Sequence, residues 1–448
     1  MPALRLITRK NATTLAGNST SLMKIHLSYG RRGLDFELPA DLDAQILHLN
    51  TLPTLENPRQ AVQNALDNPI GTLPLLELAR GKKTACMVIS DVTRPVPNPL
   101  ILHPMLETLE KAGIARPNIT ILNATGLHRP NVGSELEEMI GADIAANYRV
   151  ENHVAKNESE MTDLGEIAFG EGQRATAAIN SHYIQADLKI TTGLIEPHFM
   201  AGYSGGRKLI CPGIASAKTI LQFHAPPMIG HPHARAGNLV QNPIHAMSRA
   251  VAGVAGCDFI CNVTLSESRQ LTGVFAGDLD AAHQAGIAHV DRQTKVAVSP
   301  QEIVVTTSAG YPLDTTFYQC IKGMVGALPA LKQGGSLIIA CSLSEGIGGP
   351  EFSAMCFSLQ SVAEFIDRIY SSPVQVDQWQ LQELMLVLKH AGEVMIVSDG
   401  VSSENLGKFL LTPMPNVETA LEAARQKHGL SAGAVVIPEG PYVTPIPR

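Results

Sequence analysis

The chain has 448 residues, which is more than one hydrophobic core usually supports, so we expect two domains. Hydrophobic residues make up 45% of the sequence and charged residues 17%, a balance that excludes a disordered protein and is typical of a compact soluble one. The net charge of −7, with no long basic run and no apolar run of membrane length, predicts neither a nucleic-acid nor a membrane partner.

The first part of the chain predicts alternating strands and helices, after a polar stretch over residues 1–20 that we expect to be disordered. A hairpin is expected over 23–38, and the strand–loop–helix rhythm after it indicates parallel βαβ units. Asn98 is the expected N-cap of the second helix. The expected strands are 84–90, 119–123, 188–195, 259–265 and 271–275, and the expected helices are 60–68, 99–112, 134–140, 218–223, 243–254 and 278–288.

The periodicity lapses near residue 295 and a fresh alternation follows, so we place a domain boundary there. Residues 1–295 are predicted to form an N-terminal α/β domain, residues 296–432 a C-terminal α/β domain, and residues 433–448 a tail that returns to the N-terminal domain. The predicted fold class is α/β, with mostly parallel sheets in two domains that flank an active-site cleft. Beyond the boundary, the expected strands are 303–307, 336–341, 394–398 and 434–437, and the expected helices are 316–331, 359–369, 381–390 and 417–427.

Seven cysteines are spread through the chain, an odd number without a CxxC pair. The spacing of Cys257 and Cys261 comes nearest to a metal-binding pattern, but the sequence offers no second pair. We therefore expect reduced thiols in a cytoplasmic protein.

The most informative stretch runs from residue 188 to residue 224. A β-branched apolar run ends just before His198, and four glycines then surround a single lysine, Lys208. Glycines permit positive φ and let a ligand approach the main chain closely. A lysine in such a loop is either a phosphate-binding cation or a desolvated amine available for a covalent bond. The alternative is a glycine-rich turn with incidental histidines. The four glycines are Gly202, Gly205, Gly206 and Gly213.

Polar side chains follow three expected strands of the first domain. Asp91 and Arg94 follow one strand, His128 follows the next, and His198 follows a third. The carboxyl ends of parallel strands lie on one edge of a sheet, so these side chains should converge on one crevice. Two imidazoles suit the removal and return of a proton, and an arginine suits a carboxylate. The chain has 15 histidines, so a lone histidine would more simply be a surface or core residue.

The second domain adds a possible anion site. Gln319 and Lys322 are spaced i, i+3 and share one face near the start of an expected helix. A helix N-terminus with a lysine attracts anions. A solvated helical face is an equally simple interpretation.

These residues resemble a known family, the nickel-pincer lactate racemases and their 2-hydroxy-acid racemase relatives. Each motif is weak alone, but together they cover most of the chain in the family's order. The motifs are Asp91-Val92-Thr93-Arg94-Pro95, Thr125-Gly126-Leu127-His128-Arg129-Pro130, Asn152-His153, Glu196-Pro197-His198, Gly205-Gly206-Arg207-Lys208, Pro212-Gly213-Ile214-Ala215, His224, Gly310-Tyr311-Pro312-Leu313-Asp314, Tyr318-Gln319-Cys320-Ile321-Lys322-Gly323 and Asp377-Gln378-Trp379-Gln380.

The resemblance implies a racemase of a lactate-like 2-hydroxy acid that uses nickel. The implied cofactor is a pyridinium-3,5-bisthiocarboxylic acid mononucleotide, the nickel-pincer nucleotide, joined covalently to Lys208, with His224 as the protein ligand of the metal. Hydride transfer would be coupled to proton transfer through a 2-keto acid, and cofactor-maturation enzymes would be partners. The paired acid/base residues would be His128 and His198, the substrate-binding residues Arg94, Gln319, Lys322 and Trp379, and the other cofactor-binding residues Asp91, Thr93, Gly205 and Gly206.

Three other functions remain open at this point. The same machinery could epimerise or racemise a larger 2-hydroxy acid, such as a sugar acid, a dicarboxylic acid or an aromatic one. A pyridoxal-phosphate racemase could use Lys208, although the other marks of that family are missing. A non-catalytic nickel or cofactor carrier would share Lys208 and His224 but gives no reason for the paired histidines. Cys320 departs from relatives with a hydroxyl side chain there, which leaves the fine substrate contacts open.

Overall fold

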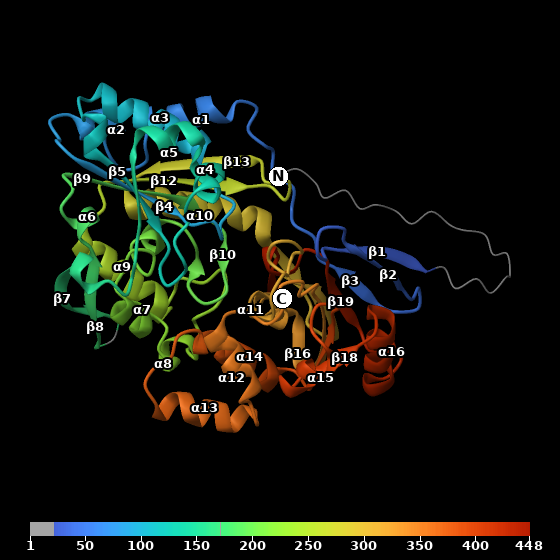
Figure 1. The fold of residues 1–448 in the computed structure, drawn as a ribbon. Coiled ribbons are helices and arrows are strands. Elements are labelled where there is room, and N and C mark those ends of the chain that lie inside the picture. Colours follow the sequence, from blue (N-terminus) through green and yellow to red (C-terminus); the bar gives the residue numbers. More distant parts are fainter. Residues whose placement is uncertain (1–21, 171) are drawn as a thin grey trace.

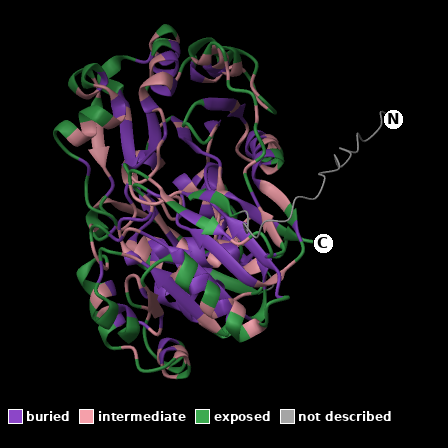
Figure 2. Cartoon of the chain, turned by 90° about the vertical axis from the view of Figure 1, so that its right-hand side faces the viewer, coloured by how far each residue is buried: buried purple, intermediate pink, exposed green. Residues whose placement is uncertain are grey.

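Two six-stranded sheets, each covered by helices, organise the chain (Figure 1). The structure is a computed structural model that describes residues 22–170 and 172–448. The expected disorder over residues 1–20 lies outside the described residues. Buried residues fill the strands of both sheets, while exposed residues lie on the outer helices and loops (Figure 2).

The first sheet is parallel except for its β12–β13 edge. Along β4, Met87 and Ile89 face one hydrophobic core, while Cys86 and Val88 face another. Burial on both faces explains the continuous apolar strands of the sequence. The strand order is β13 (Leu271–Gly277), β12 (Phe259–Leu265), β9 (Leu188–Leu194), β4 (Ala85–Ser90), β5 (Ile119–Ala124) and β6 (Arg149–Asn152).

Helices cover both faces of this sheet. The helices on one face bury side chains in the core that contains Met87, and those on the other face bury side chains in the core that contains Cys86. A further helix, α10 (Leu279–Thr294), packs against β12 and β13. The first group is α1 (Pro58–Asp67), α2 (Leu75–Ala79), α3 (Asn98–Lys111), α4 (Ser134–Ile140) and α5 (Ala142–Asn147). The second is α6 (Ser181–Ile184), α7 (Ala217–Phe223), α8 (Pro226–Ile229) and α9 (Pro243–Ala255).

The second sheet is parallel throughout. Its strand order is β18 (Thr412–Met414), β17 (Glu393–Val397), β16 (Leu331–Ala340), β15 (Gln301–Thr307), β19 (Ala434–Ile437) and β3 (Ala44–Ile46). One core lies between the sheet and α11 (Phe317–Ala327), α12 (Pro350–Phe357), α13 (Val362–Ser371), α14 (Gln378–His390) and α15 (Ser403–Lys408). The other lies under α16 (Val417–His428) and the β1–β2 hairpin (Met23–Leu27 and Leu34–Leu38).

The second sheet recruits strands from both ends of the chain, which differs from the expected domain division. The β1–β2 hairpin is present as expected, but it packs on the second sheet, and β3 is an edge strand of that sheet. The predicted N-terminal domain of residues 1–295 grouped residues 23–46 with the first sheet. In the structure these residues belong with the second sheet. In the expected tail 433–448, β19 also joins the second sheet, while β20 (Thr444–Pro447) pairs with β14 (Lys295–Val298) directly after α10. Sheet membership here is set by long-range pairing, not by local pattern.

Local departures from expectation concern one helix cap and the elements that the sequence did not predict. Asn98 is not the cap of α3: Pro97 occupies that position, and the buried Asn98 side chain makes no hydrogen bond within the described structure. Several elements had no sequence prediction, the longest of which are α12 and the hairpin β7–β8 (Met161–Phe169 and Gln173–Asn180). The shorter ones are β3, α2, α5, α6, α8, β14, α15, β18 and β20. The remaining elements are the pair β10 (Pro197–His198) and β11 (Gly202–Tyr203), and the 3₁₀ helices η1 (Arg116–Asn118), η2 (Glu158–Glu160), η3 (Gly206–Leu209), η4 (Leu328–Ala330) and η5 (Gly440–Tyr442).

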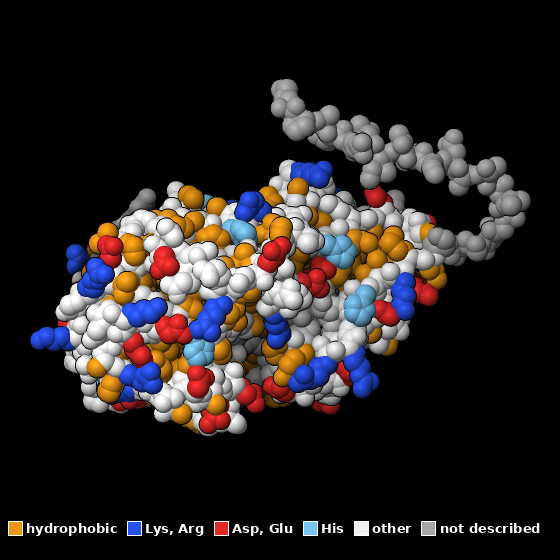
Figure 3. Space-filling view, turned by 90° about the horizontal axis from the view of Figure 1, so that it is seen from above, with side chains coloured by type: hydrophobic (Ala, Val, Ile, Leu, Met, Phe, Trp, Pro, Cys, Tyr) orange, Lys and Arg blue, Asp and Glu red, His pale blue; other side chains and the backbone are white. Residues whose placement is uncertain are grey.

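The outer surface carries charges of both signs. On the face drawn in Figure 3, Lys and Arg side chains lie interspersed with Asp and Glu. No helix among the described residues is both long enough and apolar enough to cross a membrane.

Candidate active site

A cavity of about 340 Å³ lies between the carboxyl ends of the first sheet and the helices α11 and α14. Every predicted site residue lines this cavity except Gly206, which lies directly beside it in η3. From the first sheet come Asp91, Thr93, Arg94, His128, His198, Gly205, Lys208 and His224, and from the second Gln319, Lys322 and Trp379. The sequence therefore placed residues from distant parts of the chain at one location.

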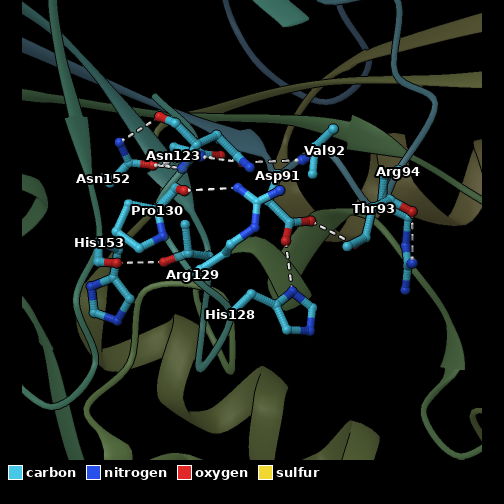
Figure 4. A network of polar contacts seen from close by, with 12 residues as sticks. Asp91, Val92, Thr93, Arg94, Asn123, His128, Arg129, Pro130, Asn152 and His153 are labelled. Atoms are coloured by element: carbon cyan, nitrogen blue, oxygen red, sulfur yellow. Dashed lines mark hydrogen bonds and ion pairs between the residues drawn. The ribbon is translucent and has the colours of Figure 1, made fainter. Parts of the chain in front are cut away.

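His128 is oriented by a buried carboxylate (Figure 4). Its Nδ1 lies 2.6 Å from Oδ2 of Asp91, while the Thr93 hydroxyl donates to Oδ1 at 2.6 Å. Burial raises the pKa of Asp91, but the hydrogen bonds from His128 and Thr93, with Arg94 nearby, outweigh it and hold the pKa below its usual value. The carboxylate therefore stays ionised and accepts the Nδ1 proton, which leaves Nε2 of His128 as the acceptor.

Asparagines fix the loops that carry this pair (Figure 4). Asn123, at the end of β5, donates to Asn131 at 2.9 Å and to Asn152 at 2.8 Å. Asn131 in turn accepts from the backbone N–H of Val92 at 3.3 Å. The ends of three neighbouring strands are thus tied together beneath His128, which is itself 57% exposed in its side chain.

The hydrogen bonds of His198 are the reverse of those of His128, because Nδ1 of His198 accepts hydrogen bonds instead of donating one. Its Nδ1 accepts from the backbone N–H groups of Met200, at 3.4 Å, and Ala201, at 3.2 Å. Nε2 therefore carries the proton when the ring is neutral. Burial lowers the pKa of His198 well below its usual value, and the cations Lys208, Arg94 and others add to this effect. The ring stacks on Phe199, with centroids 4.9 Å apart.

Cations of both domains line the same wall. Nε of Arg94 lies 3.3 Å from Oε1 of Glu196, and both side chains are about a quarter exposed. In α11, Thr316 caps the helix by accepting from the Gln319 N–H at 3.3 Å, which places Gln319 and Lys322 in its first two turns. Burial, aided by Arg94, lowers the pKa of Lys322 to about 7. The wall can hold a carboxylate with cationic groups from both domains.

Lys208 lies in the short helix η3, which a buried arginine holds in place. Arg207 is 2% exposed and donates to the carbonyl of Ala201 at 3.1 Å and to Nδ1 of His283 at 3.2 Å. Gly206 has φ +49°, and a Cβ there would lie 2.9 Å from the His283 ring. Burial lowers the pKa of Lys208 well below its usual value, and the nearby cations lower it further. Both effects favour the uncharged form of the amine, which is the nucleophilic one.

His224 ends α7, and within the described part of the chain only one of its ring nitrogens has a hydrogen-bond partner. Its Nδ1 donates to the carbonyl of Ile220 at 2.9 Å, so the lone pair resides on Nε2. The ring stacks on Trp379 with centroids 4.3 Å apart, and the Trp379 indole donates to the Tyr318 hydroxyl at 3.1 Å. Burial lowers the pKa of His224 to about 3, which keeps the ring neutral. A neutral imidazole whose other nitrogen donates to a carbonyl is typical of a metal ligand.

Two family models match the chain, one on each side of residue 295. The lactate racemase N-terminal domain matches residues 29–237, and the lactate racemase C-terminal domain matches residues 296–444. A lactate racemase of Lactiplantibacillus plantarum is 39% identical over 386 residues, 85% of this chain and 89% of the relative. Another, of Thermoanaerobacterium thermosaccharolyticum, is 35% identical over 424 residues, 94% of this chain and 98% of the relative. The chain belongs to the lactate racemase family.

Solved structures agree with this assignment. The lactate racemase apoprotein of T. thermosaccharolyticum superposes with a TM-score of 0.87 at 35% identity, and the match covers 95% of this chain and 100% of that one. A Thermotoga maritima protein that is 15% identical superposes with a TM-score of 0.67 over 89% of this chain and 100% of that one, and shares the fold alone. The predicted α/β fold class is confirmed, and so is the enzyme class: the chain is a racemase, an isomerase.

Two residues that support the predicted residues were not themselves predicted. Glu196 pairs with Arg94, and Tyr318 accepts from Trp379. Both lie inside motifs that the sequence analysis named. Glu196 stands two residues before His198, and Tyr318 stands directly before Gln319. Their positions next to predicted site residues were a usable signal in the sequence. Their contacts with Arg94 and Trp379 join different elements and could not be inferred from residue spacing.

Proposed function

We propose that the chain racemises a lactate-like 2-hydroxy acid by proton-coupled hydride transfer, through a 2-keto acid. The observation that carries this proposal is the pairing of His128 and His198 around one cavity with carboxylate-binding cations on its wall. The names of the relatives, both lactate racemases, support the substrate class.

The two histidines supply the proton chemistry. His128, with Nε2 free, is suited to take the proton of the substrate hydroxyl, and Asp91 stabilises the imidazolium that results. His198, with its proton on Nε2, is suited to hydrogen-bond the substrate oxygen on the other side. For the other enantiomer His198 must act as the base, so its ring proton must first leave Nε2 and its Nδ1 contacts must rearrange, while the protonated His128 returns the proton that it took. A racemase requires this exchange because either enantiomer is a substrate.

Arg94 and Lys322 hold the substrate carboxylate. They belong to different domains, so binding of the acid draws the two domains together and excludes water from the cavity. The Gln319 side chain lies beside them, and its Oε1 has no partner within the described structure.

The chain's residues fit a lysine-tethered nickel-pincer nucleotide. Lys208 offers a desolvated amine for the covalent link, and His224 offers Nε2 to the metal. Among residues 22–170 and 172–448, no group of three or more His, Cys, Asp or Glu side chains could hold a metal alone. The remaining donors to the metal would be supplied by the nucleotide joined to Lys208. The chemistry supplied by this group is reversible acceptance of a hydride from the substrate α-carbon.

Expression with and without cofactor-maturation enzymes tests this proposal. The matured protein should carry one nickel and a mass increase equal to the adduct, and should interconvert D- and L-lactate. Lys208→Ala should lose the mass increase. His224→Ala should lose nickel, whereas His128→Ala and His198→Ala should retain nickel and lose turnover.

The same protein preparations distinguish a racemase from a non-catalytic nickel or cofactor carrier. A protein that keeps adduct and nickel but converts no 2-hydroxy acid would contradict the proposal and favour a carrier. Turnover by a protein whose Lys208 is unmodified would show that the tether is misassigned.

A further inference from the structure

The chain segment that follows His224 is held by the second domain. The carbonyl oxygen of Pro226, two residues beyond His224, accepts a hydrogen bond from Nε2 of Gln382 at 2.8 Å. It accepts another from the hydroxyl group of Tyr370 at 3.2 Å. Pro226 lies in α8 of the first domain, whereas the two donors lie in α14 and α13 of the second (Figure 1). Two hydrogen bonds thus cross between the domains directly beside the proposed metal ligand.

The same face of α14 contacts His224 itself. Trp379 and Gln382 are spaced i, i+3, so their side chains project from one face of the helix. Trp379 stacks on the His224 ring with an angle of 26° between the two planes. It is buried in the same hydrophobic core as Phe223 and Ile229 of the first domain. One helix face therefore holds both the imidazole ring and the carbonyl group two residues after it.

The contact between the domains is closely packed at Gly230. A Cβ at this position would lie 2.8 Å from the Tyr370 hydroxyl and 3.3 Å from Nε2 of Gln382. Gln382 is 1% exposed, so its amide group is shielded from solvent. A glycine at position 230 therefore lets both donors reach the Pro226 carbonyl.

The position of His224 thus depends on both domains. Its own domain fixes the ring through the hydrogen bond from Nδ1 to the carbonyl of Ile220, and the second domain fixes the ring plane and the turn that follows. Nε2 of His224 has to face a nucleotide that extends from Lys208, which belongs to the first domain. Separation of the domains would remove the stack on Trp379 and both hydrogen bonds to Pro226 at once.

We propose that Gln382 and Tyr370 are positioning residues for the metal ligand, which hold His224 in place when the two domains are together. This inference rests on the proposed function, because it takes His224 as the protein ligand of nickel. One neutral hydrogen bond typically changes an equilibrium about fivefold. Loss of either bond should therefore speed nickel release about fivefold and lower kcat by a similar factor, because the ligand is in place in a smaller fraction of molecules.

The experiment uses the matured holoenzyme and measures nickel release to EDTA, the absorption spectrum of the bound cofactor, and kcat and KM for lactate. Gln382→Met removes one donor, and it breaks no other hydrogen bond because Oε1 of Gln382 has no partner in the described part of the chain. Tyr370→Phe removes the other donor, and Gly230→Ala displaces both. If Gly230→Ala does not fold, the other two variants decide the question.

Each variant has a matched control at a distance from His224. Gln333→Met removes an amide group that donates to a backbone carbonyl at 2.9 Å, at the C-terminal end of α14. Tyr148→Phe removes a hydroxyl group that is bonded to Glu110 on the opposite face of the first sheet. Gly253→Ala adds a methyl group to α9 at a position where no atom lies within 4 Å. Circular dichroism and the adduct mass verify that each variant is folded and matured.

We expect Gln382→Met and Tyr370→Phe to release nickel about fivefold faster, with an altered absorption spectrum and a lower kcat. The three controls should match the wild type in these measurements. Nickel release and a spectrum that are unchanged in both variants overturn the inference while the proposed function stands. A rise of KM without faster nickel release also overturns it, and means that the two bonds serve only to close the substrate cavity. A matured wild-type protein whose nickel survives His224→Ala contradicts the proposed function and the inference with it.

Discussion

His128 and His198 have opposite hydrogen-bonding partners, which breaks the symmetry of the pair before substrate binds. Asp91 accepts the Nδ1 proton of His128, whereas two backbone N–H groups donate to Nδ1 of His198. The free nitrogen of one ring is thus an acceptor and that of the other a donor. At rest the site is prepared for the enantiomer whose hydroxyl faces His128.

Single-turnover experiments on the two histidine variants test this division of labour. In His198→Asn, His128 should still remove the hydroxyl proton of one enantiomer, so bound keto acid should form from that enantiomer alone. His128→Asn should show the opposite preference, with a slower step because the Nδ1 contacts of His198 must rearrange. Net racemisation should fall about 10²–10⁴-fold in both variants, the usual cost of losing a general acid or base. Identical preferences in the two variants, followed optically on the holoenzyme, would exclude the two-base arrangement.

The pH dependence of substrate binding should report on Lys322. Burial and Arg94 lower its pKa to about 7, so the free enzyme loses this positive charge as the pH rises above 7. Because the protonated fraction then falls about tenfold for each pH unit, KM for the carboxylate substrate should rise with pH above 7. Lys322→Arg provides the control, since an arginine stays charged and should flatten the profile. An equally steep rise of KM in Lys322→Arg would mean that another group titrates.

The convergence of three of the predicted residues on one cavity could be anticipated because each follows a strand. Asp91, His128 and His198 stand where apolar runs end, and parallel sheets bring such ends together. What the sequence could not provide is the partner of each side chain. The pairing of Glu196 with Arg94 and the support of Trp379 by Tyr318 depend on three-dimensional packing between distant segments.

Among the elements, η3 determines where Lys208 points. Gly206 has φ +49° with no room for a Cβ beside His283, so both its conformation and its surroundings require glycine. Gly206→Ala should displace the loop and lower the fraction of protein that carries the adduct after maturation, as measured by intact mass. Gly334→Ala is the matched control, because Gly334 also has positive φ, at +80°, but has no atom near its missing Cβ. Equal adduct yields in both variants would show that the loop tolerates the shift.

Elements with a strong local pattern were predicted, and those without one were missed. The strand β4 is a continuous apolar run, and the β1–β2 hairpin alternates regularly about its turn. By contrast, β7 buries only Ile167 and Phe169 and is interrupted by Gly165, so its sequence carries little β-strand signal. Asn98 was a reasonable cap by residue type, but Pro97 and the preceding turn begin the helix one residue earlier.

At the scale of the whole molecule, chain order and domain order differ. The second sheet is completed by β19 between β15 and β3, and β3 comes from the opposite end of the sequence. Ala44 of β3 pairs with Ala434 of β19, and such a long-range pairing produces no local periodicity in the sequence. The predicted boundary at residue 295 therefore assigned β1, β2 and β3 to the N-terminal domain.

This topology predicts that residues 296–448 do not fold alone. Without residues 22–50, the fragment lacks β3 and the hairpin that buries Ile25, Leu27, Phe36 and Leu38 on the second sheet. Burial of such a side chain contributes about 1.5–3 kcal/mol, so the four together approach the about 5–15 kcal/mol that a whole domain has in reserve. The fragment should therefore lack a cooperative thermal transition and dispersed amide resonances.

Fusing residues 22–50 to the fragment through a flexible linker should restore both properties. In that fusion, Leu27→Asp should abolish the rescue, because it places a charge where the native side chain is fully buried. Leu22→Asp is the matched change at a 50% exposed position and should leave the rescue intact. Cooperative unfolding of residues 296–448 alone, at the temperature of the fusion, would show that the N-terminal strands are an accessory to the second domain. Loss of folding in the fusion as well would mean that the second domain needs the first sheet beside it.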